Sequence, residues 1–273
     1  MVRIDNLDDE EVSKKNKLSK MEKKKIVVFS GAGLDKESGI ATFRDSNSGL
    51  WCNYKIDEVA TPEGWRKDRG KVLEFYNQRR RELPTVQPND AHKALVALED
   101  EYDVTHVTQN VSDLLERAGS STVLHLHGEL TKARTCFGMD NPNLVATQTV
   151  YDIGYDDINI GDKDEEYGAQ LRPHIVWFGE YPFFFYNALE AFIEADIIIV
   201  IGTSMNIGYT YNFFEKCKLD TPIYFVDPSP TKSLGLEYPE LNIKYIEKGA
   251  VEGVTELVNN LIVQAIGDDK NDK

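Results

Sequence analysis

The chain has 273 residues, a formal net charge of −15 and a hydrophobic content of 41%. Its length and composition fit a globular protein with one large domain, or with a large domain and a small insert. The acidic balance argues against a nucleic-acid partner, because phosphate binding requires clustered Lys and Arg. The sequence shows neither a signal peptide nor an apolar run of the roughly 18 residues that a membrane helix needs, so we expect a cytoplasmic protein without a membrane partner.

Residues 1–24 are mostly charged and polar, which is typical of a flexible N-terminal tail. After them, short apolar strands alternate with helical patterns, and this order predicts an α/β fold with a doubly wound, mostly parallel, Rossmann-like sheet. Strands are expected at 25–29, 103–107, 123–126, 196–201 and 223–226, and helices at 70–83, 90–100, 184–195, 209–218 and 251–262. We assign 25–265 to one folded domain and 266–273 to a disordered tail.

The segment 131–170 interrupts this alternation, because it is rich in Asp, Asn and Gly, and we expect a small irregular insert there. The three cysteines of the chain, Cys52, Cys136 and Cys217, are widely spaced. This spacing indicates neither a disulfide framework nor a metal site.

A glycine-rich turn follows the first expected strand. Gly31 and Gly33 leave room for backbone N–H groups to approach a diphosphate, and a helix start nearby would favour its charge. The third glycine, Gly39, is too distant for the usual dinucleotide fingerprint. The glycines alone therefore leave nucleotide binding and a plain tight turn equally open.

Glycine or polar residues lie at or just past the ends of four expected strands. Gly31, Thr108, His127 and Gly202 take these places, and ligands of such sheets bind at the carboxyl ends of the strands. His125 and His127 are two residues apart in a strand and would share a face. By themselves they are compatible with two buried, hydrogen-bonded imidazoles, and a metal-binding pair lacks an evident third ligand.

The helix expected at 70–83 carries an arginine among apolar residues. Val72, Tyr76, Arg79 and Leu83 form one stripe at helical spacing, whereas Arg80 and Arg81 turn away from it. An inward-facing arginine suits a carboxylate, which its planar fork can bind with two hydrogen bonds. The alternative is an arginine whose stem packs on the helix while its head reaches solvent or an internal carboxylate.

Five segments of the chain resemble those of the sirtuins, the NAD-dependent protein deacylases, and occur in the same order. They are the glycine loop 31–44, Thr-Gln-Asn at 108–110, His-Leu-His-Gly-Glu at 125–129, the segment 171–180 and Gly-Thr-Ser at 202–204. Together they span roughly 25–262. The resemblance implies a sirtuin-type catalytic domain at 25–265, with acylated lysine side chains of proteins as substrates and NAD as the co-substrate.

The resemblance also implies roles for particular residues. His127 would be the catalytic base and Asn110 would orient the ribose and a water. After nicotinamide has left, His127 would deprotonate a ribose hydroxyl, which attacks the acyl carbon, and water would release free lysine and O-acyl-ADP-ribose. The implied NAD contacts are Gly31, Ala32, Gly33, Phe43, Arg44, Gln109, Asn110, Gly202, Thr203, Ser204, Asp227 and Ala250. The implied substrate contacts are Ala60, Tyr76, Arg79, Val176, Phe178 and Gly179.

Tyr76 and Arg79 resemble the YxxR motif of the class III sirtuins, which remove succinyl and malonyl groups. The resemblance therefore implies a desuccinylase and demalonylase that also removes acetyl groups. Most sirtuins hold a structural zinc with four cysteines in the insert, but 131–170 contains only Cys136. Since a tetrahedral site needs four Cys or His ligands, we predict no metal and an insert held by aromatic packing and turn hydrogen bonds.

Several residues depart from the family pattern. Asp35 replaces a usual serine, Ser112 replaces a usual aspartate with Asp113 one position late, and Leu115 stands where a histidine is common. A carboxylate at Asp35 would repel the NAD diphosphate unless it points away or meets a cation. Two alternatives therefore stay open: a protein that binds NAD or ADP-ribose with little turnover, and an NAD-cleaving or ADP-ribosylating enzyme.

Overall fold

A computed structural model describes residues 23–41, 54–136, 149–165 and 168–271, with side chains up to residue 267. Its larger sheet has six parallel strands in the order β3-β2-β1-β7-β8-β9. The strands are β1 Lys25–Ser30, β2 Asp103–Thr108, β3 Val123–His125, β7 Ile197–Ile201, β8 Ile223–Val226 and β9 Ile243–Ile246. The predicted α/β, Rossmann-like class is confirmed. The sequence prediction omitted β9, a partly exposed edge strand without a continuous apolar run.

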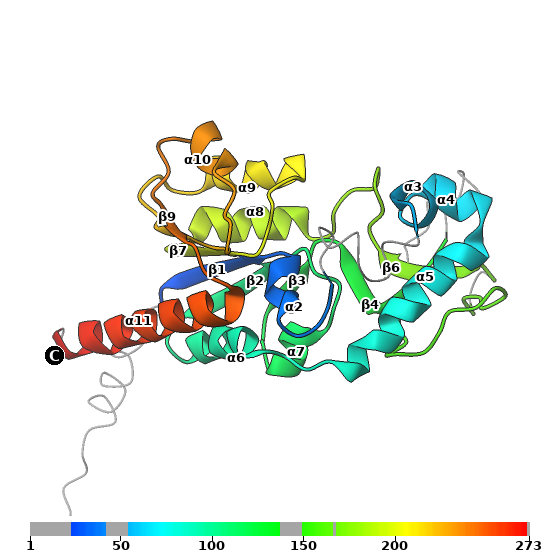
Figure 1. Ribbon diagram of the computed structural model, residues 1–273, viewed down its shortest axis with the longest axis horizontal. Helices are drawn as coiled ribbons and strands as arrows, with labels where there is room; N and C mark the ends of the chain where they lie inside the picture. Colours follow the sequence, from blue (N-terminus) through cyan, green and yellow to red (C-terminus); the bar gives the residue numbers. More distant parts are fainter. Residues whose placement is uncertain (1–22, 42–53, 137–148, 166–167, 272–273) are drawn as a thin grey trace, which may run out of the picture.

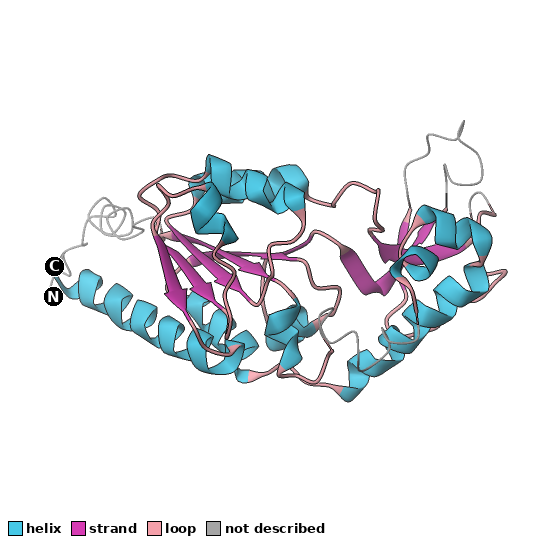
Figure 2. Ribbon diagram, turned by 45° about the horizontal axis from the view of Figure 1, so that its top comes forward, coloured by secondary structure: helices cyan, strands magenta, loops and turns pink. Residues whose placement is uncertain are grey.

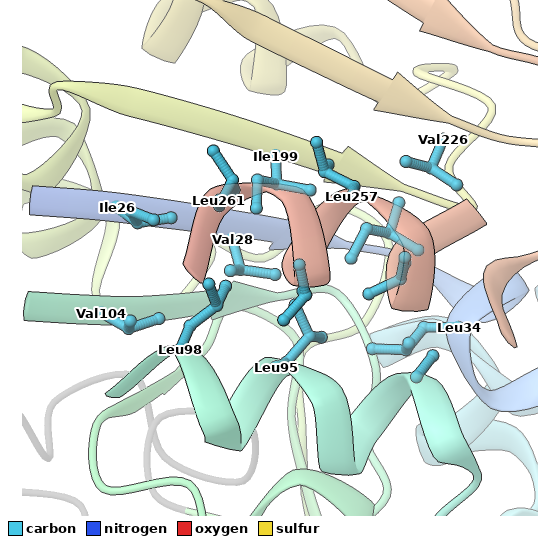
Figure 3. Close-up of a cluster of buried hydrophobic side chains, with 14 of the residues drawn as sticks. Ile26, Val28, Leu34, Leu95, Leu98, Val104, Ile199, Val226, Leu257 and Leu261 are labelled. Atoms are coloured by element: carbon cyan, nitrogen blue, oxygen red, sulfur yellow. The ribbon is translucent and has the colours of Figure 1, made fainter. Parts of the chain in front are cut away.

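Helices cover both faces of this sheet (Figure 1). On one face lie α2 Ala32–Lys36, α6 Asp90–Ala97, α7 Leu114–Ala118 and α11 Ala250–Asn271. On the other lie α8 Phe185–Glu194, α9 Tyr211–Lys216 and α10 Ser233–Glu237. The strand β1 contributes side chains to the cores on both faces of the sheet, because successive side chains alternate between the faces. Ile26 and Val28 meet α6 and α11 (Figure 3), whereas Val27 and Phe29 belong to the opposite core.

The five predicted helices are present, and apart from the C-terminal end of α11 their ends differ from the prediction by a few residues. The predicted helix 70–83 is α5 Arg69–Glu82, and the end of the helix predicted at 90–100 is a separate 3₁₀ turn, Leu98–Asp100. The disordered tail predicted at 266–273 is wrong over most of its length, because α11 continues to Asn271. No proline interrupts this segment, and extending a formed helix costs little free energy.

A second, smaller lobe lies beside the large sheet (Figure 2). It contains the antiparallel sheet β5-β4-β6, built from β4 Gly128–Thr135, β5 Val150–Asp152 and β6 Leu171–Ile175. The helices α3 Ile56–Val59, α4 Pro62–Lys67 and α5 pack on it. The region predicted as irregular therefore holds part of a sheet. Its strands escaped the sequence analysis because they bury charged residues, Arg134 and Arg172, in place of an apolar run.

Aromatic packing contributes to this lobe, as in the contact between Trp65 and Trp177 with ring centroids 5.6 Å apart. Cys136 is buried in the same cluster. Within the described ranges of the chain, no helix is long and apolar enough to cross a membrane. The predicted tail 1–24 lies outside these ranges except for its last two residues, and Lys23 Nζ donates to the carbonyls of Glu99 and Asp100.

Candidate active site

The site is built at the carboxyl edge of the large sheet. Gly31 follows β1, Gln109 follows β2, Gly202 follows β7 and Asp227 follows β8, while His127 stands two residues past β3. The chain order reverses between β1 and β7, and ligands of doubly wound sheets bind at such a switch point. The predicted convergence of the strand ends is thus present.

Two backbone segments cross closely at this switch point. Gly33 N–H donates to Gly202 O at 2.9 Å, and a Cβ on Gly33 would lie 2.5 Å from Gly202 Cα. Gly202 has a φ of +57°, which also favours glycine. The helix α2 begins beside this crossing, and its first turn has no side-chain cap. Small residues and an uncapped helix start fit a diphosphate, so the geometry suits the phosphates of NAD.

Asn110 is held by hydrogen bonds from its own side chain and is not a helix cap. Its Nδ2 donates to Gly31 O at 3.0 Å and to Asp35 Oδ1 at 2.8 Å. The following helix, α7, has Asp113 in the cap position instead. These bonds fix the direction of the carboxamide, so that its oxygen faces away from Asp35.

Asp35 is 4% exposed, and its carboxylate is bound by groups of the protein. Besides Asn110, it accepts a hydrogen bond from Ser112 Oγ at 2.6 Å and faces His92 Nε2 at 3.2 Å. Asp113 does not take over this place, because it accepts a hydrogen bond from the Tyr155 hydroxyl. The two departures from the family pattern therefore form one hydrogen-bonded pair behind Asn110.

His127 is a neutral imidazole with a defined tautomer. Its Nδ1 lies 3.0 Å from Gln109 O, which only accepts, so Nδ1 carries the proton. Nε2 lies 2.7 Å from Tyr209 Oη and accepts from that hydroxyl. Burial lowers the pKa of His127 to about 4, opposed only by the Gln109 carbonyl. Near neutral pH, Nε2 is therefore the nitrogen that can take a proton.

His125 is a hydrogen-bonded structural imidazole. Its Nδ1 lies 2.9 Å from Asn110 O and its Nε2 lies 2.8 Å from Glu116 Oε1. Burial lowers its pKa, but the hydrogen bond and charge of Glu116 outweigh burial, and the net shift is upward. Glu116, His125 and Glu129 are close enough to hold an ion, yet Glu129 pairs with Lys132 at 2.7 Å. An imidazolium beside Glu116 explains the cluster without a metal.

The segment after β6 lies between His127 and the small lobe. Val176 N–H donates to His127 O at 2.9 Å, and Phe178 N–H donates to Ala60 O at 3.0 Å. Ala60 is buried, whereas Phe178 is exposed and Gly179, with a φ of +92°, has open space around it. The structure thus places Val176 against the backbone of the candidate base and Phe178 against Ala60.

Glu180 holds this segment in place. Its carboxylate accepts from Arg172 Nη1 at 2.7 Å, from Arg134 Nη2 at 3.0 Å and from Trp177 N–H at 2.8 Å. Burial raises the pKa of Glu180, but Arg172 and Arg134 outweigh burial and hold it below its ordinary value. The sequence analysis did not assign this role to Glu180. The paired arginines at buried strand positions are visible only once the register is known.

Tyr76 and Arg79 lie on α5 in the small lobe, but the orientation assigned to Arg80 is wrong. The Tyr76 hydroxyl accepts from Trp177 Nε1 at 3.1 Å, and the Arg79 guanidinium lies 5.7 Å from the centre of the Phe75 ring. Burial lowers the pKa of Arg79. Arg80 is fully buried, because its Nε donates to a backbone carbonyl of β4 at Leu130.

The other predicted residues take separate places around the edge of the sheet. Thr203 Oγ1 donates to Gln109 Oε1 at 2.9 Å, and Asp227 is buried and accepts from Ser229 N–H. Ala250 is the first residue of α11. Ala32 is in α2, and Ser204 follows Thr203. Phe43 and Arg44 lie outside the described residues.

Residues 31–208 match the family model of the Sir2 family. The chain belongs to the Sir2 family. An NAD-dependent protein deacylase of Helicobacter pylori is 45% identical over 89% of this chain and 99% of its own length. One from Bacteroides thetaiotaomicron is 42% identical over 88% of this chain and 98% of its own.

Solved Sir2 structures share the fold of this Sir2 chain. A mutant Sir2 homologue in complex with ADP-ribose superposes with a TM-score of 0.74 at 32% identity, over 90% of this chain and 94% of that one. A Sir2 homologue in complex with NAD gives a TM-score of 0.73 at 32% identity, over 92% and 94% of the two chains. The family membership and the fold implied by the sequence are confirmed. No sequence motif indicates that Tyr209 contacts His127, the candidate catalytic base of this sirtuin.

Proposed function

We propose that this sirtuin removes acyl groups from lysine side chains of proteins, with NAD as its co-substrate. The observation that carries the proposal is His127, a partly buried neutral imidazole at the carboxyl edge of the sheet, with Nδ1 on the Gln109 carbonyl and Nε2 as its basic nitrogen. The names of the bacterial relatives, NAD-dependent protein deacylases, support the same reaction class. The products are nicotinamide, O-acyl-ADP-ribose and free lysine.

Two groups of residues bind the two substrates. One group holds NAD: Gly31, Ala32, Gly33, Phe43, Arg44, Gln109, Asn110, Gly202, Thr203, Ser204, Asp227 and Ala250. Those toward the small lobe hold the acyl-lysine: Ala60, Tyr76, Arg79, Val176, Phe178 and Gly179. Asn110 orients the ribose, and its fixed carboxamide supports this role. His127 takes the proton of a ribose hydroxyl, so that the hydroxyl oxygen can attack the acyl carbon.

The test of the reaction is peptide-dependent release of nicotinamide from NAD. Wild type is compared with His127→Ala on matched succinyl-lysine and acetyl-lysine peptides. We expect product from wild type and none from the variant. Binding of NAD without release from either peptide would contradict the proposal and indicate an NAD-binding protein. Release without any peptide would instead indicate an NAD-cleaving enzyme.

We further propose that Tyr76 and Arg79 select acidic acyl groups, so that succinyl and malonyl lysine are preferred over acetyl lysine. Arg79 is half-buried over an aromatic ring, where water competes less for a guanidinium than at the surface. A guanidinium in such a place binds a carboxylate with two hydrogen bonds. The Tyr76 hydroxyl lies on the same helix face, fixed by Trp177.

Arg79→Met tests this selectivity, because Met keeps the apolar stem and removes the charge. We expect desuccinylation to fall by about 100-fold, as a lost charge-assisted pair of about 3 kcal/mol implies, while deacetylation changes little. Arg81→Met is the matched control, since Arg81 is exposed and pairs with Asp157. Equal loss of both activities in Arg79→Met would contradict the proposed role.

We also propose that the small lobe folds without zinc. Cys136 packs among apolar side chains of that lobe, and its segment supplies no second cysteine. Elemental analysis of the purified protein is the check. About one zinc per chain would overturn the proposal, because four ligands would then have to be found.

A further inference from the structure

His127, the candidate base of this sirtuin, already has a hydrogen-bond partner on Nε2, its only unprotonated ring nitrogen. Tyr209 Oη lies 2.7 Å from His127 Nε2. Because Nδ1 is engaged with Gln109 O, Nε2 carries the one available lone pair, and the Tyr209 hydroxyl donates its proton to that lone pair. A ribose hydroxyl that needs a base at His127 therefore meets Tyr209 first.

The Tyr209 ring is held from several sides. It makes edge-to-face contacts with His127 at 6.1 Å, with Phe185 at 6.2 Å and with Phe213 at 6.1 Å between ring centres. Phe213 is fully buried in the core that covers the large sheet. Rotating the Tyr209 side chain to move its hydroxyl away from Nε2 would break these ring contacts. The packing therefore favours the position in which the hydroxyl bonds Nε2.

We propose that Tyr209 is a catalytic residue that relays the proton of the ribose hydroxyl to His127. The proposal rests on the deacylase function proposed above. The ribose O–H bond breaks and its proton binds Tyr209 Oη, while the original Tyr209 O–H bond breaks and that proton binds His127 Nε2. Tyr209 is neutral before and after, His127 becomes an imidazolium, and the electron pair left on the ribose oxygen forms the bond to the acyl carbon.

The protonation states of both residues agree with this relay. Burial raises the pKa of Tyr209 and lowers that of His127, so both side chains are neutral near pH 7. A tyrosine that does not ionise transfers a proton only by receiving another at the same time. The hydroxyl thus acts as a bridge and not as a base of its own.

Tyr209→Phe is the decisive variant, because it removes one oxygen and keeps the packing on Phe185 and Phe213. Exchange of labelled nicotinamide into NAD reports the first step, and O-acyl-ADP-ribose formation reports the step that needs the relay. We expect product formation to fall at least about tenfold while exchange persists, since proton transfer contributes factors of this size or larger. NAD affinity by calorimetry and the thermal midpoint should match wild type.

Tyr211→Phe is the matched control, because the Tyr211 hydroxyl bonds Ser233 Oγ at 2.7 Å and faces away from the base. It should behave as wild type. Unchanged product formation in Tyr209→Phe would overturn the relay, and faster product formation would also overturn it, by showing that the hydroxyl blocks Nε2. If wild type gives no product and no exchange, the deacylase function is overturned, and the relay with it.

A second variant guards against a folding defect in Tyr209→Phe. Tyr209→3-fluorotyrosine keeps the hydroxyl and its packing but makes the O–H more acidic. The relay requires the rate of product formation to respond to this change while nicotinamide exchange does not. Equal response of both rates would contradict a role in the second step.

Discussion

Asp35 and Ser112 show how two unusual residues can satisfy one another. The family pattern has serine at the first position and aspartate at the second, and this chain has them exchanged. Ser112 Oγ donates to Asp35 Oδ2 at 2.6 Å, so the two exchanged residues form one carboxylate–hydroxyl hydrogen bond. Asp35 also fixes Asn110, which makes it a positioning residue for the candidate NAD site.

Reversing the exchange tests this compensation. Asp35→Ser leaves Asn110 and His92 without their carboxylate, and Ser112→Asp places two carboxylates side by side. We expect each single variant to lose about 2 kcal/mol of stability and most of its activity. The double variant should recover more than half of both, measured by urea denaturation and product formation in a double-mutant cycle. Additive losses would show that the two positions do not interact.

At this scale the sequence could predict which residues meet but not how they bond. His127, Asn110 and Gln109 belong to motifs, and the structure places them together. The Asp35–Ser112 bond was not predicted, because it joins residues 77 positions apart and depends on the register of β1 and β2. The hydroxyl of Tyr209 reaches His127 across 82 positions, outside any motif.

The crossing of the β1–α2 turn and the end of β7 is the element on which the site depends. Both segments have glycine at the crossing because their backbones touch: a Cβ on Gly33 would lie 2.5 Å from Gly202 Cα. A side chain at either position must push the strands apart. This constraint comes from the protein itself, apart from any ligand.

Gly33→Ala should therefore destabilise the fold by about 3 kcal/mol and weaken NAD binding together, since overpacking a close backbone contact costs about this much. Thermal melting and calorimetric titration with NAD measure the two effects. Gly267→Ala is the control, because its position in α11 is exposed with nothing within 4 Å. A Gly33→Ala protein as stable as wild type would show that the crossing can relax.

Five of the six strands of the large sheet were predictable because each has a short apolar run that tertiary packing reinforces, which the edge strand β9 lacks. The strand β7, for example, consists entirely of isoleucine and valine, as expected for a strand covered on both faces. In the small lobe, β4 and β6 place Arg134 and Arg172 in the interior, where both pair with Glu180. Local periodicity cannot reveal a strand whose buried positions are charged.

Over the whole molecule, neutral imidazoles with lowered pKa values set the response to acid. Burial lowers the pKa of His127, His106 and His174 to about 4 each, and these residues lie in both lobes. The unfolded chain takes up protons at these histidines near pH 6.5, but the folded chain does not until about pH 4. The unfolded state thus binds more protons in this window, and stability must fall as the pH falls through it.

We expect urea denaturation to show a loss of up to about 1.4 kcal/mol per pH unit for each such imidazole between pH 6.5 and 5. His125 acts in the opposite direction, because Glu116 raises its pKa and its contribution is lost as the pH rises. His174→Gln should make the dependence shallower by about one proton. A slope that does not change in this variant would show that His174 is protonated in the folded state.

The segment that carries His127 is also one of the links between the two lobes, since it joins β3 of the large sheet to β4 of the small one. Gly128, the next residue, has a φ of +86°, and a Cβ there would lie 1.9 Å from His174 O, so this link is tightly fitted to β6. A rotation of one lobe against the other must then change the aim of the imidazole. The rate of proton transfer at His127 is therefore expected to depend on the angle between the two lobes.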